Sequence, residues 1–252
     1  MKFIKNKINS NFDKAAKSYD TVANIQKICA KNLIDKLTTY FYRSQDNIAR
    51  ILDVGTGTGY VPQILTKKYP NSCYDLNDIS YNMLIMAKSK LSNLNIKYNL
   101  ILGDIENLDL TAYNLIISNF ALQWVINLPK ILKKLYNKSD ILAFSCLLDG
   151  TFVEWTNKFK NLGSDYTHQY PKPNILQNLL LSLNPKKHFF ATKEYQLYFN
   201  NALAFIRYLK DLGAASTMND SIPVSELRRI IKTNNQPFIV TYKVFFAIVE
   251  RG

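Results

Sequence analysis

The segment ILDVGTGTGY at residues 51–60 constrains the fold of this chain more than any other. Its apolar start predicts a buried strand with an acidic residue, Asp53, near its end. Glycines at 55, 57 and 59 follow at once, and they let the backbone turn sharply and approach a ligand closer than a Cβ atom would permit. The N–H groups at the start of the next helix would point at that ligand. The segment therefore predicts a nucleotide-binding domain of the α/β class.

The spacing of the glycines narrows the class of ligand that this turn can bind. A dinucleotide fingerprint needs a glycine three residues after the second one, but Tyr60 occupies that position and the third glycine is Gly59. The remaining pattern, D-x-G-x-G-x-G, is typical of S-adenosylmethionine-dependent methyltransferases, with the Asp53 carboxylate facing the amino-acid part of the cofactor. On this motif alone, another Rossmann-like binder or a purely structural glycine-rich turn stays open.

A second carboxylate follows the next expected strand, residues 72–77. Asp78 lies about 20 positions beyond the glycines, where this fold class places the group that binds the ribose hydroxyls. Asp75 is the rival carboxylate, but it lies inside the strand and we expect it to have a local polar role.

Two further expected strands, 98–102 and 113–117, also end in polar residues. Asp104 follows the first strand and Asn119 the second. Because ligands of open parallel sheets bind outside the carboxyl ends of the strands, we expect these side chains to converge with Asp53 and Asp78 on one crevice. Taken alone, Asp104 could equally be an ordinary helix cap.

The chain is long enough for one large α/β domain, and no repeat or low-complexity linker divides its 252 residues. We expect an N-terminal helical cap at 1–48, a cofactor-binding core at 49–148, a substrate-side insertion at 149–192, and C-terminal strands and a helix of the same sheet at 193–252. Within the cap, residues 11–20 mix aromatic and short polar side chains, as in a segment that folds over a pocket. The insertion is rich in aromatics and prolines, and could select the substrate or simply cover apolar surface.

The amino-acid composition restricts the cellular location and the binding partners that can be expected. Three cysteines without metal-ligand spacing suggest neither a disulfide framework nor a metal site. No apolar run approaches the ~18 residues of a membrane span, so we expect a cytoplasmic protein that does not use a membrane. The formal net charge of +13 fits a polyanionic partner, but a lysine- and asparagine-rich genome would give the same excess. With no basic tail or arginine-rich stripe, we do not expect a nucleic-acid substrate.

Five short segments together resemble one family. They are NFDKAAKSYD at 11–20, GDIE at 103–106, SNFALQW at 118–124, LKDLGA at 209–214 and TYKVF at 241–245. From about residue 9 to the C-terminus, the chain is similar to the malonyl-acyl-carrier-protein O-methyltransferases of biotin synthesis. The chain departs from that family at 138–140, where KSD replaces the usual Pro-Gly, and in the insertion. These departures affect the assignment of the methyl acceptor more than the assignment of the cofactor.

The resemblance implies both a fold and a reaction. The fold is a Rossmann-like class I methyltransferase, with a mostly parallel seven-stranded sheet, an antiparallel last strand and helices on both faces. The reaction moves a methyl group from S-adenosylmethionine to the free carboxylate of a malonyl thioester on acyl carrier protein, and so hides a charge that would be costly to bury in an elongation enzyme. A carboxylate attacks without a base, so no catalytic acid or base is assigned, and alignment and exclusion of water should supply the catalysis. We expect a monomer without a metal.

The expected site residues combine the motifs with the resemblance. For the cofactor they are Tyr19, Asp53, Gly55, Thr56, Gly57, Gly59, Asp78, Ile79, Met83, Asp104, Ile105 and Asn119. For the substrate they are Tyr19, Gln123, Trp124, Arg207 and Lys210. Arg207, on an expected helix over 202–212, could grip the carboxylate through paired hydrogen bonds, with Lys210 on the same face. A solvated surface arginine stays open, as do packing roles for Tyr19 and Trp124.

The sequence is also compatible with other functions. The acceptor could be another small carboxylate or a quinone precursor on the same fold. The chain could also be a non-catalytic subunit that binds S-adenosylmethionine, or an RNA methyltransferase. Adenine methylation usually brings an Asn/Asp-Pro-Pro-aromatic motif after the fourth strand, whereas this chain has SNFA at 118–121, which argues against it.

Overall fold

The computed structural model describes residues 2–41, 48–160, 169–215 and 223–252, with the backbone alone given for residues 2–4. The strands are β1 (Arg50–Val54), β2 (Cys73–Asp78), β3 (Lys97–Leu102), β4 (Tyr113–Asn119), β5 (Ser139–Leu147), β6 (Lys187–Phe199) and β7 (Phe238–Glu250). The helices are α1 (Lys2–Ala15), α2 (Tyr19–Val22), α3 (Asn24–Tyr40), α4 (Tyr60–Leu65), α5 (Tyr81–Leu91), the 3-10 turn η1 (Leu122–Trp124), α6 (Leu128–Asn137), α7 (Val153–Lys160), α8 (Pro173–Leu181), α9 (Ala202–Asp211) and α10 (Val224–Thr233).

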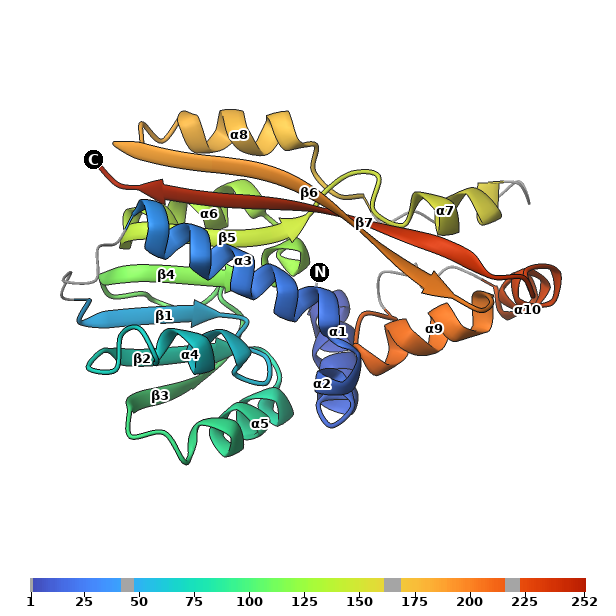
Figure 1. The fold of residues 1–252 in the computed structure, drawn as a ribbon, viewed down its shortest axis with the longest axis horizontal. Coiled ribbons are helices and arrows are strands. Elements are labelled where there is room, and N and C mark those ends of the chain that lie inside the picture. The colour runs from blue at the N-terminus through green and yellow to red at the C-terminus, as the bar shows by residue number, and fades with distance from the viewer. Residues whose placement is uncertain (1, 42–47, 161–168, 216–222) are drawn as a thin grey trace.

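The strands form one seven-stranded sheet in the order β3-β2-β1-β4-β5-β7-β6 (Figure 1). The five strands from β3 to β5 pair in parallel, and β7 runs antiparallel to both β5 and β6. The expected fold class is confirmed. Among the described residues, no helix is long and apolar enough to cross a membrane.

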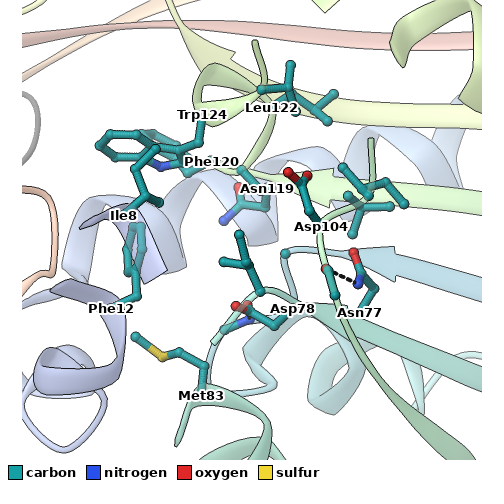
Figure 2. A pocket seen from close by; sticks show the side chains of 18 of the residues that line it. Ile8, Phe12, Asn77, Asp78, Met83, Asp104, Asn119, Phe120, Leu122 and Trp124 are labelled. Carbon is teal, nitrogen blue, oxygen red and sulfur yellow. Dashed lines mark hydrogen bonds between the residues drawn. The ribbon is translucent and has the colours of Figure 1, made fainter. Parts of the chain in front are cut away.

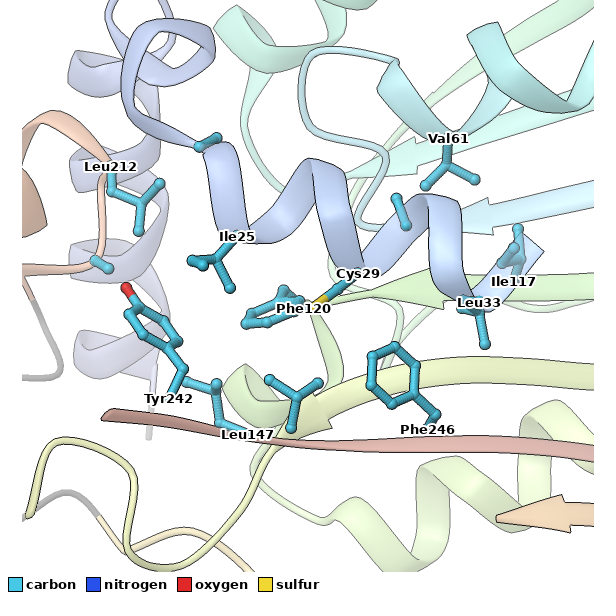
Figure 3. Packing of buried hydrophobic residues seen from close by; sticks show 14 of the residues in the cluster. Ile25, Cys29, Leu33, Val61, Ile117, Phe120, Leu147, Leu212, Tyr242 and Phe246 are labelled. Carbon is cyan, nitrogen blue, oxygen red and sulfur yellow. The ribbon is translucent and has the colours of Figure 1, made fainter. Parts of the chain in front are cut away.

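The central strands are buried on both faces, and their side chains alternate between two cores. In β1, Ile51 joins a core with α3 and α4, whereas Leu52 joins a core with α6 and α8. Figure 3 shows the first core, where Leu33 of α3 packs over Ile117 of β4 and Phe246 of β7. Because both faces are covered by helices, the sheet leaves its edges and the carboxyl ends of its parallel strands for function.

β6 and β7 run on past the carboxyl ends of the other strands, and α7, α9 and α10 gather around this extension (Figure 1). Its interior is aromatic, with Trp155 of α7 lying 5.2 Å from Phe205 of α9 between ring centroids. The one helix expected within 193–252 corresponds to α9, whereas α10 was not predicted, because its ten residues are mostly polar and only Ile230 among them is buried. Trp155 and Phe159 of the insertion pack against each other at 5.2 Å, as expected of a structural cap.

The N-terminal segment is helical, as its periodicity predicts, and it crosses the open end of the parallel strands. α1 packs against α5 on one side and α9 on the other, while α3 continues back along the sheet (Figure 1). This course places α1 directly over the edge of the sheet at which the predicted site residues lie.

Candidate active site

The glycine-rich turn after β1 adopts the backbone that its sequence predicts. Gly55, Gly57 and Gly59 have φ values of 69°, 55° and 81°, a region that side chains with a Cβ atom rarely adopt. A Cβ atom on Gly55 would lie 2.2 Å from the Cβ of Ala121, so the turn is held tightly against η1. A Cβ atom on Gly57 would meet no atom within 4 Å. The backbone at Gly57 therefore faces open space, as close contact with a ligand requires.

Asp78 lies at the carboxyl end of β2, beside this turn. Its carboxylate accepts hydrogen bonds from the backbone N–H groups of Gly57, at 2.8 Å, and Ser80, at 2.9 Å. Burial raises its pKa to about 6, against the effect of these two donors. The side chain thus joins the glycine turn to the start of α5 while lining a pocket.

Asp53 has an unusual environment, because it is 1% exposed and neither carboxylate oxygen has a hydrogen-bond partner among the described residues. Burial raises its pKa to about 7, and the nearby charge of Asp78 acts in the same direction. A buried carboxylate without a partner is costly, so this group is poised to interact with a cation. Asp75, by contrast, accepts hydrogen bonds from Arg50, Asn99 and Tyr113, which confirms its local role.

The larger pocket, of about 700 Å³, opens at the carboxyl ends of β1, β2 and β4 (Figure 2). Its position outside the carboxyl ends of parallel strands is where this fold class binds small-molecule ligands. Ile8 and Phe12 of α1 face Asp78 and Asn119 across it. The predicted cofactor residues that line it are Tyr19, Gly55, Gly57, Asp78, Ile79, Met83, Asp104, Ile105 and Asn119. Asp53, Thr56 and Gly59 do not line it, because the turn places them behind its wall.

The N-terminal helices close this pocket through polar contacts. Lys5 of α1 lies 3.2 Å from both Asp104 oxygens and 2.7 Å from Glu106. Asp13 accepts hydrogen bonds from Ser80 and Asn82 at the start of α5. Charges and hydrogen bonds thus attach this segment to the core in addition to its buried side chains Ile8 and Ala15. The Lys5 contact could not be predicted from local patterns, because its partners lie about 100 residues further along the chain.

A smaller pocket of about 350 Å³ adjoins the larger one. Both pockets share Phe12, Tyr19, Phe120 and Trp124, so the two pockets adjoin along an aromatic wall formed by these side chains. The Phe12 and Trp124 rings meet edge to face at 5.6 Å. Phe120, with φ 58°, holds a backbone conformation uncommon outside glycine, as residues at functional sites often do. The other lining residues are Gln26, Gln123, Leu147, Phe152, Leu212, Ala214 and Tyr242.

The predicted substrate residues divide into two groups. Tyr19, Gln123 and Trp124 line the smaller pocket. Arg207 and Lys210 line neither pocket, and both side chains are exposed on α9. The helical pattern of 202–212 correctly placed them on one face, but tertiary packing turns that face to solvent and directs Leu212 inward instead.

Sequence reasoning missed Gln26, Phe152 and Tyr242 as pocket residues. The buried Oε1 atoms of Gln26 and Gln123 have no hydrogen-bond partner among the described residues. Phe152 connects the insertion to the pocket, so part of that segment does reach the site. No local pattern distinguishes Tyr242 from its neighbours in β7, since each alternate side chain of that strand faces the same core.

Comparison with known proteins agrees with this geometry. Residues 51–138 match a family model described as a methyltransferase domain. The malonyl-[acyl-carrier protein] O-methyltransferase of Neorickettsia risticii is 30% identical over 97% of this chain and 96% of its own. That of Priestia megaterium is 35% identical over 79% of this chain and 69% of its own. The chain belongs to the malonyl-acyl-carrier-protein O-methyltransferase family. It is an S-adenosylmethionine-dependent methyltransferase.

A solved structure supports the fold independently of close sequence similarity. Phosphoethanolamine N-methyltransferase 2 of Haemonchus contortus, in complex with S-adenosyl-L-methionine, superposes with a TM-score of 0.58 at 13% identity, over 95% of this chain and 57% of that one. The residues here fit such a cofactor. The larger pocket offers open backbone at Gly57, the Asp78 carboxylate and the Asp104 carboxylate, and the unpaired Asp53 carboxylate lies just behind the turn.

Proposed function

We propose that this enzyme methylates the free carboxylate of a malonyl group carried as a thioester on acyl carrier protein, the first step towards the pimeloyl chain of biotin. The observation that carries the proposal is the smaller pocket, which adjoins the cofactor site across the wall formed by Phe12, Tyr19, Phe120 and Trp124. Its mostly apolar lining with a few uncharged polar groups would suit a short acyl group. The names of the relatives support the same acceptor.

The cofactor residues named above would hold S-adenosylmethionine in the larger pocket. When bound, it supplies a methyl group already activated by its sulfonium. Tyr19, Gln123 and Trp124 would align the acceptor from the smaller pocket, and the aromatic wall would exclude water. No residue has to remove a proton, because the acceptor carboxylate is ionised and nucleophilic. Gln26 and Gln123 each offer a buried oxygen that would accept an N–H from the arm of the substrate.

Arg207 and Lys210 suit a docking role better than direct contact with the reacting carboxylate. Both are exposed on α9, and Leu212 and Ala214 just beyond the helix line the smaller pocket. Acyl carrier proteins are acidic, and a basic helix at the pocket mouth would guide them through complementary charge. We propose that this face of α9 contacts the carrier, with the enzyme acting as a monomer in the cytoplasm.

A methyl-transfer assay with labelled S-adenosylmethionine tests the proposal. Malonyl-carrier protein should be labelled, and acetyl-carrier protein, which lacks the free carboxylate, should not. The label should be released by mild alkaline hydrolysis, as an ester requires. Labelling of free malonate or of a quinone precursor at the rate seen with malonyl-carrier protein would instead support the alternative acceptors.

A further inference from the structure

The smaller pocket combines apolar walls with uncharged polar groups. Among the described side chains that line it, none is a lysine, arginine, aspartate or glutamate. Two basic side chains lie outside the description: Arg43, in the segment 42–47, and Lys2, of which only the backbone is described. The polar groups are the phenols of Tyr19 and Tyr242, the indole of Trp124 and the amides of Gln26 and Gln123.

Tyr242 is the most deeply placed of these groups. It is 1% exposed, it projects from β7 towards Leu212 (Figure 3), and its hydroxyl lies 3.0 Å from that of Tyr208 on α9. Burial raises the pKa of Tyr242 well above its ordinary value, with smaller contributions from Tyr208, Tyr170 and Tyr19, and burial raises the pKa of Tyr208 to about 12. Both phenols therefore stay protonated at neutral pH. If Tyr208 donates to Tyr242, the Tyr242 O–H hydrogen is free for a ligand.

Such donors offset only part of what it costs to bring a carboxylate out of water, and the rest needs a positive charge. The described side chains that line the adjoining larger pocket do not offer one. Lys5 is already paired with Asp104 and Glu106, and the other charged residues lining that pocket are aspartates. The charge that remains is that of the cofactor itself, which would lie in the adjoining larger pocket.

Building on the proposed function, we infer that the hydroxyls of Tyr242 and Tyr19 hold the acceptor carboxylate and that the sulfonium of S-adenosylmethionine is its counter-ion. Acceptor binding then depends on the charge of the bound cofactor. In the transfer, a bond forms between the carboxylate oxygen and the methyl carbon, and the carbon–sulfur bond breaks with its electron pair staying on sulfur. Both charges disappear together, so no ion pair holds the ester product in the pocket.

Calorimetric titration of wild-type enzyme with malonyl-carrier protein tests the charge. One sample is saturated with sinefungin, whose protonated amine replaces the sulfonium, and the other with S-adenosylhomocysteine, whose sulfur is neutral. We expect binding roughly tenfold tighter or more in the sinefungin complex, since opposite charges a few ångströms apart in a dry site attract strongly. The carrier bearing the malonyl methyl ester is the matched ligand, and it should bind both complexes alike.

Equal affinity of malonyl-carrier protein for the two complexes would overturn the counter-ion inference and leave the proposed acceptor intact. No binding to either complex would refute the proposed function and the inference together.

The role of the Tyr242 hydroxyl is tested with Tyr242→Phe in the sinefungin complex, where malonyl-carrier protein should bind about tenfold more weakly while sinefungin affinity is unchanged. Tyr195→Phe is the control, because it loses a hydroxyl that accepts a hydrogen bond from Asn32 away from both pockets. Unchanged acceptor affinity in folded Tyr242→Phe would overturn that assignment.

Discussion

At the scale of single residues, Asp78 combines two tasks in one carboxylate. It orders the glycine turn through Gly57 and the start of α5 through Ser80, and it lines the larger pocket, in which we propose that the cofactor binds. The first task could not be read from the sequence, because both donors are backbone groups that only the fold brings to Asp78. Spacing alone, however, predicted its place at the carboxyl end of the second strand.

Asp78→Asn should weaken S-adenosylmethionine binding more than tenfold, because the loss of a charge-assisted hydrogen bond commonly costs about 1.5–3 kcal/mol. Calorimetry on folded protein measures the change. Asp109→Asn, an exposed position that does not line the pocket, is the control and should bind normally. An Asp78→Asn protein with wild-type affinity would show that the residue does not hold the cofactor.

Asp53 should make the free enzyme less stable as the pH rises. Its pKa is about 7 in the fold against an ordinary value of 3.8, so between these pH values the folded state binds more protons than the unfolded state. The linkage relation then requires stability to fall from about pH 4 to above pH 7, by on the order of 4 kcal/mol for a shift of this size. Urea unfolding should find Asp53→Asn more stable than wild type at pH 8, with the difference shrinking towards pH 5. A difference that does not vary with pH would contradict this account.

At the scale of elements, we propose that α1 is the part of the molecule that opens and closes the site. Lys5, Phe12 and Asp13 attach it to three different partners, and few of its side chains are deeply buried. We expect residues 5–20 to exchange amide hydrogens quickly in the free enzyme and slowly with cofactor bound, as measured by mass spectrometry. Lys5→Gln should speed exchange further. Exchange as slow as that of Ile51–Val54 without ligand would rule out a closing role.

Gly213, just beyond α9, fixes where α1 lies. A Cβ atom there would sit 2.7 Å from the Phe12 ring, and φ is 74°. Gly213→Ala should therefore displace α1, lower the free energy of unfolding by about 1–3 kcal/mol and weaken cofactor binding. Gly150→Ala is a matched control, because its φ of 86° imposes similar strain, but its new Cβ would meet only the flexible Lys243 side chain. Equal effects on cofactor affinity would mean that strain alone, not the position of α1, is responsible.

At the scale of the whole molecule, the net charge of +13 should attract an acidic carrier protein and speed its association with the enzyme. Raising the salt concentration above ~0.15 M, where the screening length is about 8 Å, should increase the KM for malonyl-carrier protein more than that for malonyl-coenzyme A. Arg207→Ala should raise the KM for the carrier substrate alone. If Arg207→Ala instead lost turnover equally on malonyl-carrier protein and malonyl-coenzyme A, Arg207 would hold the reacting carboxylate, as its residue type first suggested.

The lining of the larger pocket, where we propose that the cofactor binds, was largely predictable from the sequence, because it is built from local signals. A buried strand, a glycine turn and the next helix follow one another within about ten residues, and parallel strands bring their carboxyl ends to one edge. Asp78 and Asp104 could therefore be assigned from their position after a strand. Local spacing also placed Gln123 and Trp124 after the fourth strand.

The acceptor half depended on tertiary structure. Its walls come from α1, α3, η1, the segment before α7, the end of α9 and β7, which lie far apart in the sequence. Residue type pointed to Arg207 as the group facing the carboxylate, but the packing of α9 leaves that side chain in solvent and brings Leu212 to the pocket. In the sequence, Tyr242 looks like any other inward-facing residue of a buried strand. Only the fold brings its hydroxyl next to that of Tyr208. Strand and turn chemistry act over neighbouring residues, whereas the direction in which a distant side chain points is decided only when the whole core is packed.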